Sequence, residues 1–391
     1  MNASKSNSRL RILVLSFTPS RSEPRALKQI RLLAQTHAVT SAGFGEPAVD
    51  GVPHIALDPS PPLEGLMKLP LVYTASLVLR FYSFLSLKDP RTSSALRQLS
   101  GETWDIIIAH DVLTVPLARA LNPRVGVLVD LHEYAPRQEE HSWKFRRLIA
   151  PYFRWILRKH VSKCAAVTTV SQGIVDEYRR DFGIESALVI NATPFHELQP
   201  SPPHDPIRLV HSGIPAPHRK LEVMIDAVKQ TKSNVQLDLY LVPTNDDYMS
   251  FLRNRANGDP RIRFRDPVPY DELVETLNDY DIGLSLIAPT TFNLAWCLPN
   301  KFFDFVQARL GVIIGPSPEM VNFVNTYGFG LVSEAFTAEA LAKVLDDLTP
   351  KKITDLKSAA DSHALDLSGE QQSRVWGEVV ERMIEEHAHT A

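Results

Sequence analysis

The stretch 298–316, Leu-Pro-Asn-Lys-Phe-Phe-Asp-Phe-Val-Gln-Ala-Arg-Leu-Gly-Val-Ile-Ile-Gly-Pro, shows in one place how this chain is built. A Pro-Asn-Lys turn opens an amphipathic helix, and the short apolar strand 312–314 follows that helix at once. A helix that leads directly into a buried strand is typical of α/β folds with a parallel sheet. The start of this helix also offers unpaired backbone N–H groups, which suit an anion.

The same alternation runs through the first half of the chain. Continuous apolar runs predict buried parallel strands, and helical patterns lie between them. These runs are at 11–16, 38–42, 105–109, 125–129, 166–170 and 187–190. We therefore predict a doubly wound sheet with right-handed crossovers.

A Pro-rich stretch between Thr193 and Pro206 predicts a stiff linker, after which the alternation restarts. The second set of strands is predicted at 207–211, 235–241, 262–264, 282–286 and 312–314. The expected fold class is α/β, with two Rossmann-like doubly wound parallel-sheet domains facing a central cleft. The expected domains are residues 1–200 and 201–368, and a final helix at about 369–388 is expected to return to the first domain.

The amino-acid composition of the chain argues against several classes of protein. The 42 basic and 45 acidic residues give a formal charge of −3, which argues against a nucleic-acid binder. The only two cysteines, Cys164 and Cys297, provide neither a disulfide framework nor a cysteine metal site, and they favour a reducing cytoplasm. The first nine residues are polar, so no signal peptide is expected.

Five motifs occur in a fixed order along the chain. They are Ile107-Ile-Ala-His-Asp111, Val129-Asp-Leu-His-Glu133, Val167-Thr-Thr-Val-Ser-Gln-Gly173, His211-Ser-Gly-Ile with His218-Arg-Lys-Leu-Glu222, and the segment Leu298–Gly315. Together they resemble the retaining glycosyltransferases of GT-B fold, the glycosyl transferases group 1 family, over nearly the whole chain. The resemblance implies transfer of a sugar, with retention, from a UDP- or GDP-sugar to a glycan or lipid-linked acceptor. Such a reaction would serve cell-surface polysaccharide or glycolipid synthesis.

Such a transfer leaves a diphosphate whose negative charge must be stabilised. Fixed cations and helix-end amides can do this without a metal ion. The expected donor-binding residues are Arg219, Lys220, Asn300, Lys301, Asp304 and Gly213, with Asp304 accepting hydrogen bonds from the ribose. No histidine, cysteine or aspartate spacing indicates a metal site, so we expect no cofactor beyond the nucleotide-sugar substrate.

His132 follows the strand 125–129, whose end at Asp130 is expected to face the cleft. A lone histidine is more often structural, but the acidic neighbours Asp130 and Glu133 favour a functional role. The resemblance implies that His132 steadies the donor sugar, with Asp130 and His110 as further catalytic candidates. It also implies that the leaving phosphate takes the acceptor proton, so no carboxylate pair at glycosidase spacing is needed.

Three features depart from the family pattern. Asp304 stands where the family usually has Glu, Trp296 stands where another Glu is common, and the first turn, 16–20, lacks a glycine-rich loop. Two alternatives therefore remain open. The chain could be a nucleotide-sugar 2-epimerase of the same fold, or a non-catalytic donor-binding partner of an active glycosyltransferase.

Two stretches of the first half bear on the acceptor. The run Leu69–Leu87 has Arg80 as its only charge, but Pro70 and Arg80 make it a poor membrane span. Trp143–Lys163 is a basic helical pattern with interleaved aromatic residues, which suits an anionic membrane surface. We expect a cytoplasmic protein bound peripherally to the inner face of the plasma membrane. Ordinary packing of these aromatic residues on the sheet is the equal alternative.

Overall fold

The computed structural model describes residues 9–19, 21, 23–47, 49–58, 71–244 and 246–390. The chain divides into two compact units. Unit 1 consists of the residues up to Ile190, Thr291–Asn293 and those from Ser373 onward. Unit 2 consists of Asn191–Thr290 and Leu294–Gln372.

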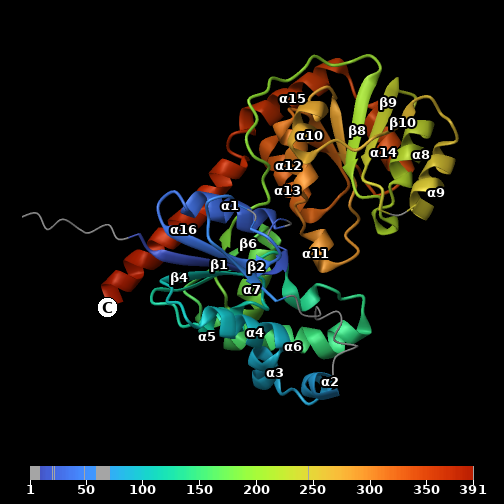
Figure 1. Ribbon diagram of the computed structural model, residues 1–391. Helices are drawn as coiled ribbons and strands as arrows, with labels where there is room; N and C mark the ends of the chain where they lie inside the picture. The colour runs from blue at the N-terminus through green and yellow to red at the C-terminus, as the bar shows by residue number, and fades with distance from the viewer. Residues whose placement is uncertain are drawn as a thin grey trace, which may run out of the picture. The chain divides into compact units, whose positions relative to one another are not determined.

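Unit 1 is built on a seven-stranded sheet in the order β3-β2-β1-β4-β5-β6-β7, in which every pair of neighbours is parallel (Figure 1). The strands are β1 Arg11–Pro19, β2 Ala38–Phe44, β3 His54–Leu57, β4 Ile106–His110, β5 Gly126–Leu131, β6 Ala166–Thr169 and β7 Ala187–Leu188. The six strands predicted from apolar runs are all present. The structure adds β3, which is short and only partly buried.

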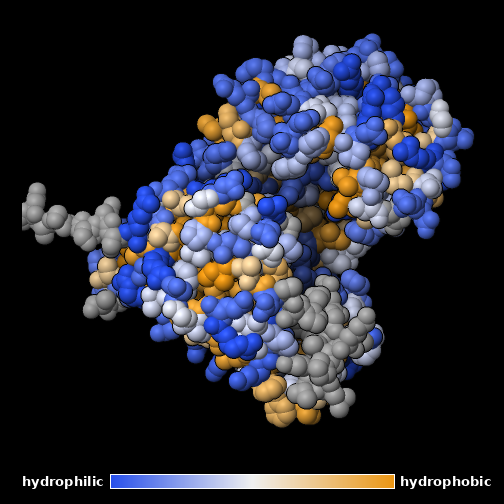
Figure 2. Space-filling view, viewed as in Figure 1, coloured by the Kyte–Doolittle hydropathy of each residue, from blue (hydrophilic) through white to orange (hydrophobic). Residues whose placement is uncertain are grey.

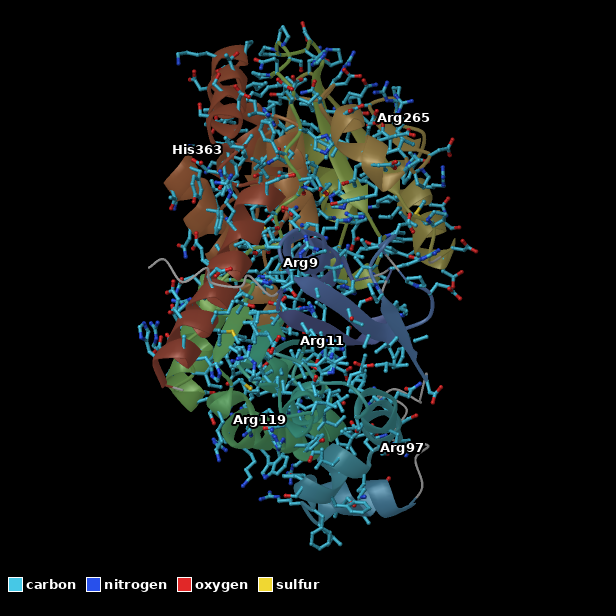
Figure 3. All side chains as sticks on the ribbon, turned by 60° about the vertical axis from the view of Figure 1, so that its left-hand side comes forward. Arg9, Arg11, Arg97, Arg119, Arg265 and His363 are labelled. Atoms are coloured by element: carbon cyan, nitrogen blue, oxygen red, sulfur yellow. The ribbon has the colours of Figure 1, made fainter. Side chains whose placement is uncertain are left out.

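The helices of unit 1 connect these strands. They are α1 Pro24–Leu33, α2 Leu71–Val78, α3 Tyr82–Lys88, α4 Pro90–Leu99, α5 Val115–Ala120, α6 Ala150–Lys159 and α7 Gln172–Phe182. The last helix, α16 Gly369–Thr390, contributes Val379, Val380 and Met383 to the buried core over β1 and β4. Arg11, labelled in Figure 3, begins β1 and donates from its backbone N–H to Asp105 at 2.8 Å.

Unit 2 repeats the plan with a six-stranded parallel sheet in the order β10-β9-β8-β11-β12-β13 (Figure 1). Its strands are β8 Ile207–Gly213, β9 Val235–Leu241, β10 Ile262–Arg265, β11 Ile282–Ser285, β12 Gly311–Ile314 and β13 Gly330–Val332. Its helices are α8 Glu222–Gln230, α9 Asp246–Ala256, α10 Tyr270–Leu277, α12 Asn300–Gln307, α13 Pro318–Tyr327, α14 Ala338–Asp346 and α15 Pro350–His363, and the short α11 Phe292–Ala295 spans the division between the units. The predicted fold class of two Rossmann-like α/β domains is confirmed.

The basic segment Trp143–Lys163 is helical from Trp143 to Lys159, as its pattern predicted, but the helix is irregular. It contains a π-helical turn at Phe145–Ile149 before α6, and a separate 3₁₀ turn follows at Val161–Lys163. Pro151 lies in the first turn of α6 and has no N–H to donate to a preceding turn. A regular α-helix can therefore begin here but cannot run through this point undisturbed.

The apolar run Leu69–Leu87 forms two short helices, α2 and α3. Its first two residues, Leu69 and Pro70, lie outside the described residues. Within the described ranges, no helix combines the length and apolar character that a bilayer span requires.

Candidate functional sites in the two units

The first site lies where β4 and β5 end. His110 and Asp130 are partners in the parallel register of these strands, and His132 follows two residues later. The carboxyl ends of parallel strands are where open α/β sheets bind ligands. The three predicted catalytic residues are thus brought together in unit 1.

Asp130 is the most deeply buried charged residue of this site. Its carboxylate is fully buried and accepts hydrogen bonds from Arg25, Gln29 and Thr168, at 2.7 to 3.0 Å. Although burial opposes its charge, the Arg25 guanidinium holds the pKa of Asp130 well below its usual range. Removing one partner of such a buried ion pair costs about 3–5 kcal/mol. The burial of Asp130 suits the support of a neighbouring group better than contact with a substrate.

A chain of hydrogen bonds sets the tautomer of His110. Gln29 donates from Nε2 to Asp130 at 2.9 Å, and its Oε1 lies 3.0 Å from His110 Nε2. Because an amide oxygen can only accept, the hydrogen of His110 is on Nε2 and its Nδ1 is an acceptor. His132 Nε2 lies 3.1 Å from that Nδ1 and is therefore the donor. The buried residues fix the orientation of the His132 ring in this way.

The two imidazoles differ in charge. Burial lowers the pKa of His110 to about 3, so this ring is neutral. Burial opposes charge on His132 as well, but the carboxylates of Asp111 and Asp130 raise its pKa to about 9. His132 Nδ1 lies 3.7 Å from carboxylate oxygens of both Glu23 and Asp111. His132 is therefore a cation at neutral pH, and its side chain is 18% exposed.

Glu23, His110 and His132 also form a group whose ligand atoms all lie within 4.8 Å of one another, as a metal site would require. Both ring nitrogens of His110 are already used, one with Gln29 and the other with His132. A metal ion would have to displace at least one of these hydrogen bonds. The geometry of the described residues fits the hydrogen-bonded pair of imidazoles better.

The second site lies in unit 2, where β8 ends and α12 begins. His211 donates from Nδ1 to the carbonyl of Leu284 at 2.8 Å, so its Nε2 accepts from Lys301 Nζ at 3.2 Å. Gly213 has φ +140°, and a Cβ at this position would lie 2.8 Å from Lys301 Nζ and 3.7 Å from Arg219 Nη1. The space left by the missing side chain of Gly213 is therefore where the two cations converge.

Lys301 is strongly perturbed by this arrangement. Its burial, followed by the charge of Arg219, lowers its pKa to about 7. Among the described residues, no carboxylate lies within ion-pair distance of Lys301 or Arg219, although the more distant charge of Asp304 partly offsets the fall in the pKa of Lys301. Two adjacent cations without a paired carboxylate favour a bound anion at this point.

Two further predicted donor-binding residues lie at the surface near these cations in the sequence. Lys220 is exposed with φ +48°, directly after the 3₁₀ turn Pro217–Arg219. Asn300 is exposed as the first residue of α12, whose N-cap Pro299 has no side chain that can accept from the helix N–H groups. Both positions leave polar groups available to an anion at the helix start.

Asp304 has protein partners. It is buried, and its Oδ1 accepts from the Thr193 hydroxyl at 2.6 Å and from the Tyr270 hydroxyl at 3.4 Å. This carboxylate therefore holds the segment after residue 190 and the start of α10 against α12. Its expected contact with the ribose remains a prediction.

The sequence analysis did not assign a role at these sites to Glu23, Arg25 and Gln29, and it named His211 only as part of a motif. A signal was present for two of them. Arg25 and Gln29 lie four residues apart and share the buried face of α1 with Ala26, Ile30 and Leu33. Polar side chains in an apolar helical stripe need buried partners, and Asp130 and His110 are those partners.

A comparison of the sequence with known protein families finds a match to one family. Residues 22–191 match the family described as Glycosyl transferase 4-like domain. Among curated proteins, no sequence matches this chain.

Solved structures resemble the chain over nearly its whole length. Anabaena HepE in complex with UDP gives a TM-score of 0.69 at 13% identity, covering 96% of this chain and 100% of that one. A Rickettsia africae glycosyltransferase gives 0.68 at 13% identity, covering 96% and 99%. Sucrose-phosphate synthase from Thermosynechococcus elongatus gives 0.68 at 15% identity, covering 96% and 100%. At sequence identities of 13–15%, this structural similarity shows that the chain shares the fold of these proteins.

Proposed function

We propose that this chain, a glycosyltransferase of GT-B fold with a Glycosyl transferase 4-like domain at residues 22–191, transfers a sugar from a UDP-sugar with retention of anomeric configuration. The observation that carries the proposal is the pair of cations, Lys301 and Arg219, that converges over Gly213 without a paired carboxylate. UDP rather than GDP is favoured because structures of HepE hold UDP and UDP-glucose.

In this proposal the donor diphosphate binds between Lys301 and Arg219. The anion would restore the charged state that burial opposes in Lys301, and His211 would hold the ammonium in place. Lys220 and the N–H groups at the start of α12 would complete the phosphate contacts. As the bond to the sugar breaks, these fixed charges stabilise the leaving phosphate without a metal ion.

His132 is proposed to act on the sugar. It is a partly exposed cation in a fixed orientation, so it can donate a strong hydrogen bond to a sugar hydroxyl. His110 and Asp130 are proposed to position it from their buried sites. The leaving phosphate would take the acceptor proton, so that the departing and attacking groups share one face of the sugar.

The acceptor is proposed to be a glycan or a lipid-linked sugar in cell-surface polysaccharide or glycolipid synthesis. What supports this is the surface of unit 1, where exposed apolar and basic side chains lie on α2, α3 and α6. We propose that the enzyme works in the cytoplasm, attached peripherally to the inner face of the plasma membrane.

Turnover of UDP-glucose tests the reaction. Purified protein is incubated with this donor and an acceptor-bearing membrane fraction, UDP release is followed, and the anomeric proton of the product is examined by NMR. The proposal predicts acceptor-dependent UDP release and an α-linked product. An epimerised nucleotide sugar formed without acceptor would favour the 2-epimerase, and UDP binding without turnover would favour the non-catalytic partner.

The variant His132→Ala separates the roles of the two sites. It should lower turnover by about 100-fold or more, the usual cost of losing one preorganised donor, while UDP affinity stays nearly unchanged. The matched control is His141→Ala, because His141 is an exposed histidine of the same unit. Wild-type turnover in His132→Ala would remove this residue from the mechanism.

A further inference from the structure

An exposed apolar turn joins α2 to α3. The chain reverses at residues 79–81, where Arg80 has φ +60°, and α3 then begins at Tyr82. Val78, Leu79, Phe81 and Phe84 around this turn are 45–61% exposed. Figure 2 shows hydrophobic residues gathered at the tip where α2 and α3 meet in Figure 1. Several large apolar side chains in one turn form a patch of the kind that marks an interaction site.

Two cavities adjoin this turn. One, of about 550 Å³, is lined mainly by the aromatic residues Phe81, Tyr82, Phe84 and Trp155. The other, of about 430 Å³, is lined by Arg80, Arg154, Arg158 and Lys159 together with Tyr82, Pro151 and Trp155. The two cavities share Arg80, Tyr82 and Trp155, so an aromatic recess leads directly into a basic one.

The packing of α6 explains why its basic residues face this cavity. Tyr152, Phe153, Ile156 and Leu157 are the buried face of the helix. Three of the basic residues that line the cavity lie on the other side of α6 or at its margin. The interleaved aromatic residues therefore serve two purposes, since Tyr152 and Phe153 pack inside the unit while Trp155 lines the cavities.

The charges of the basic cavity are not balanced from within. Among the described residues, no acidic side chain lines it, and Arg154 is the one of its four cations with an ion pair, to Asp181 at 3.6 Å. Arg158 lies over the Phe182 ring at 5.3 Å, which leaves its guanidinium edge free of a carboxylate among the described residues. The complementary ligand is an anion with several acceptor oxygens, such as a phosphate.

We propose that this surface, the tip 78–84 together with the basic cavity of α6, binds an anionic phospholipid of a bilayer. The headgroup phosphate would occupy the basic cavity, and the turn 79–81 would enter the apolar region beside it. A water-soluble phosphate would use the basic cavity but would give no reason for the exposed apolar turn. The inference deepens the proposed membrane association and rests on it, but it does not depend on the donor site.

The test is co-sedimentation of the full chain with vesicles of phosphatidylglycerol and of phosphatidylcholine. Wild type should bind the anionic vesicles and lose most of this binding in high salt. Arg80→Ser should lower the partition coefficient about fivefold, as expected for one basic residue at an anionic surface. Phe81→Ser should lower it about tenfold or more, because it removes an inserting aromatic side chain.

The matched controls are Arg97→Ser and Phe251→Ser. Arg97, labelled in Figure 3, is an exposed arginine of α4 that does not line either cavity, and Phe251 is a 45% exposed phenylalanine of unit 2. Both controls should bind vesicles as wild type does. Melting temperatures of all four variants show whether each one is folded.

Several results would overturn the proposal. One is no binding to either vesicle, and another is equal binding by Arg80→Ser, Phe81→Ser and the controls. Stabilisation by inorganic phosphate that Arg80→Ser abolishes, without vesicle binding, would assign the cavity to a free phosphate. A dimer in sedimentation velocity that Phe81→Ser disrupts would assign the turn to a second copy of the chain. UDP affinity, measured on the same samples, reports on the donor site independently, so the two proposals can fail separately.

Discussion

Lys301 is a buried ionisable side chain and His132 is a partly exposed one, and the two pKa values are shifted in opposite directions. Burial, and then the charge of Arg219, lowers the pKa of Lys301 to about 7, whereas the carboxylates beside His132 outweigh its burial and raise its pKa to about 9. The first residue gains from an added anion, and the second already has its counter-charges. This difference fits Lys301 for binding phosphate and His132 for donating hydrogen bonds.

When UDP binds above pH 7, Lys301 of the protein should take up a proton. In the free protein Lys301 loses its proton as pH rises through about 7, while a bound diphosphate would raise its pKa and keep it charged. UDP affinity should therefore fall as pH rises above 7. Calorimetry at about pH 8 in two buffers of different ionisation enthalpy measures the uptake, which Lys301→Met should abolish. A proton count of zero in the wild type would contradict the assignment.

Gln29→Leu tests the positioning chain behind His132. Without the Gln29 oxygen, the hydrogen of His110 is free to move to Nδ1, where it opposes the His132 N–H. The pKa of His132 should then fall, and the alkaline limb of the activity profile should move below the wild-type value near 9. UDP affinity should not change. A profile that loses amplitude but keeps its alkaline limb would mean that Gln29 has only a structural role.

At the scale of elements, α12 is positioned by a glycine in the neighbouring strand. Gly283 in β11 leaves room for Phe305 of α12, and a Cβ there would lie 2.3 Å from the ring. The helix that carries Lys301 therefore packs directly against the sheet. Gly213 leaves room for the Lys301 ammonium in the same way, so two glycines determine where the cation lies.

Gly283→Ala should push α12 away from β11. Overpacking a core in this way costs about 1–3 kcal/mol of unfolding free energy, and UDP affinity should fall because Lys301 moves with the helix. Urea unfolding and UDP titration measure the two effects. Gly101→Ala is the control, since a Cβ there meets no atom within 4 Å and the substitution should be nearly neutral. Equal UDP affinity in the two variants would show that the packing of α12 does not set the donor site.

The strands were predictable because continuous apolar runs are local signals, and His110 and Asp130 could be chosen as candidates because each lies at the end of such a run. The parallel register that places them side by side at the ends of β4 and β5 is known only from the structure, because it joins two separate strands. The contacts of Arg25 with Asp130 were not predictable, because they join residues 105 positions apart whose spacing gives no pairing information. The partners of Asp304 escaped prediction for the same reason, since Thr193 lies 111 positions away.

At the scale of the whole molecule, each unit repeats one plan and carries a different chemistry at the ends of its strands. Unit 1 presents a cationic imidazole held by buried neighbours, and unit 2 presents a pair of cations beside a helix start. The parallel topology explains this arrangement, because it brings the carboxyl ends of the strands to one edge of each sheet.

The most direct test is a calorimetric titration of UDP into the wild type, Lys301→Met and Lys232→Met. Lys232 is an exposed lysine of the same unit and serves as the matched control. We predict one UDP site in the wild type, equal affinity in Lys232→Met, and a loss of about tenfold or more in Lys301→Met, the cost of a charge-assisted hydrogen bond. No UDP binding by the wild type, or equal affinity in Lys301→Met and Lys232→Met, would contradict the account.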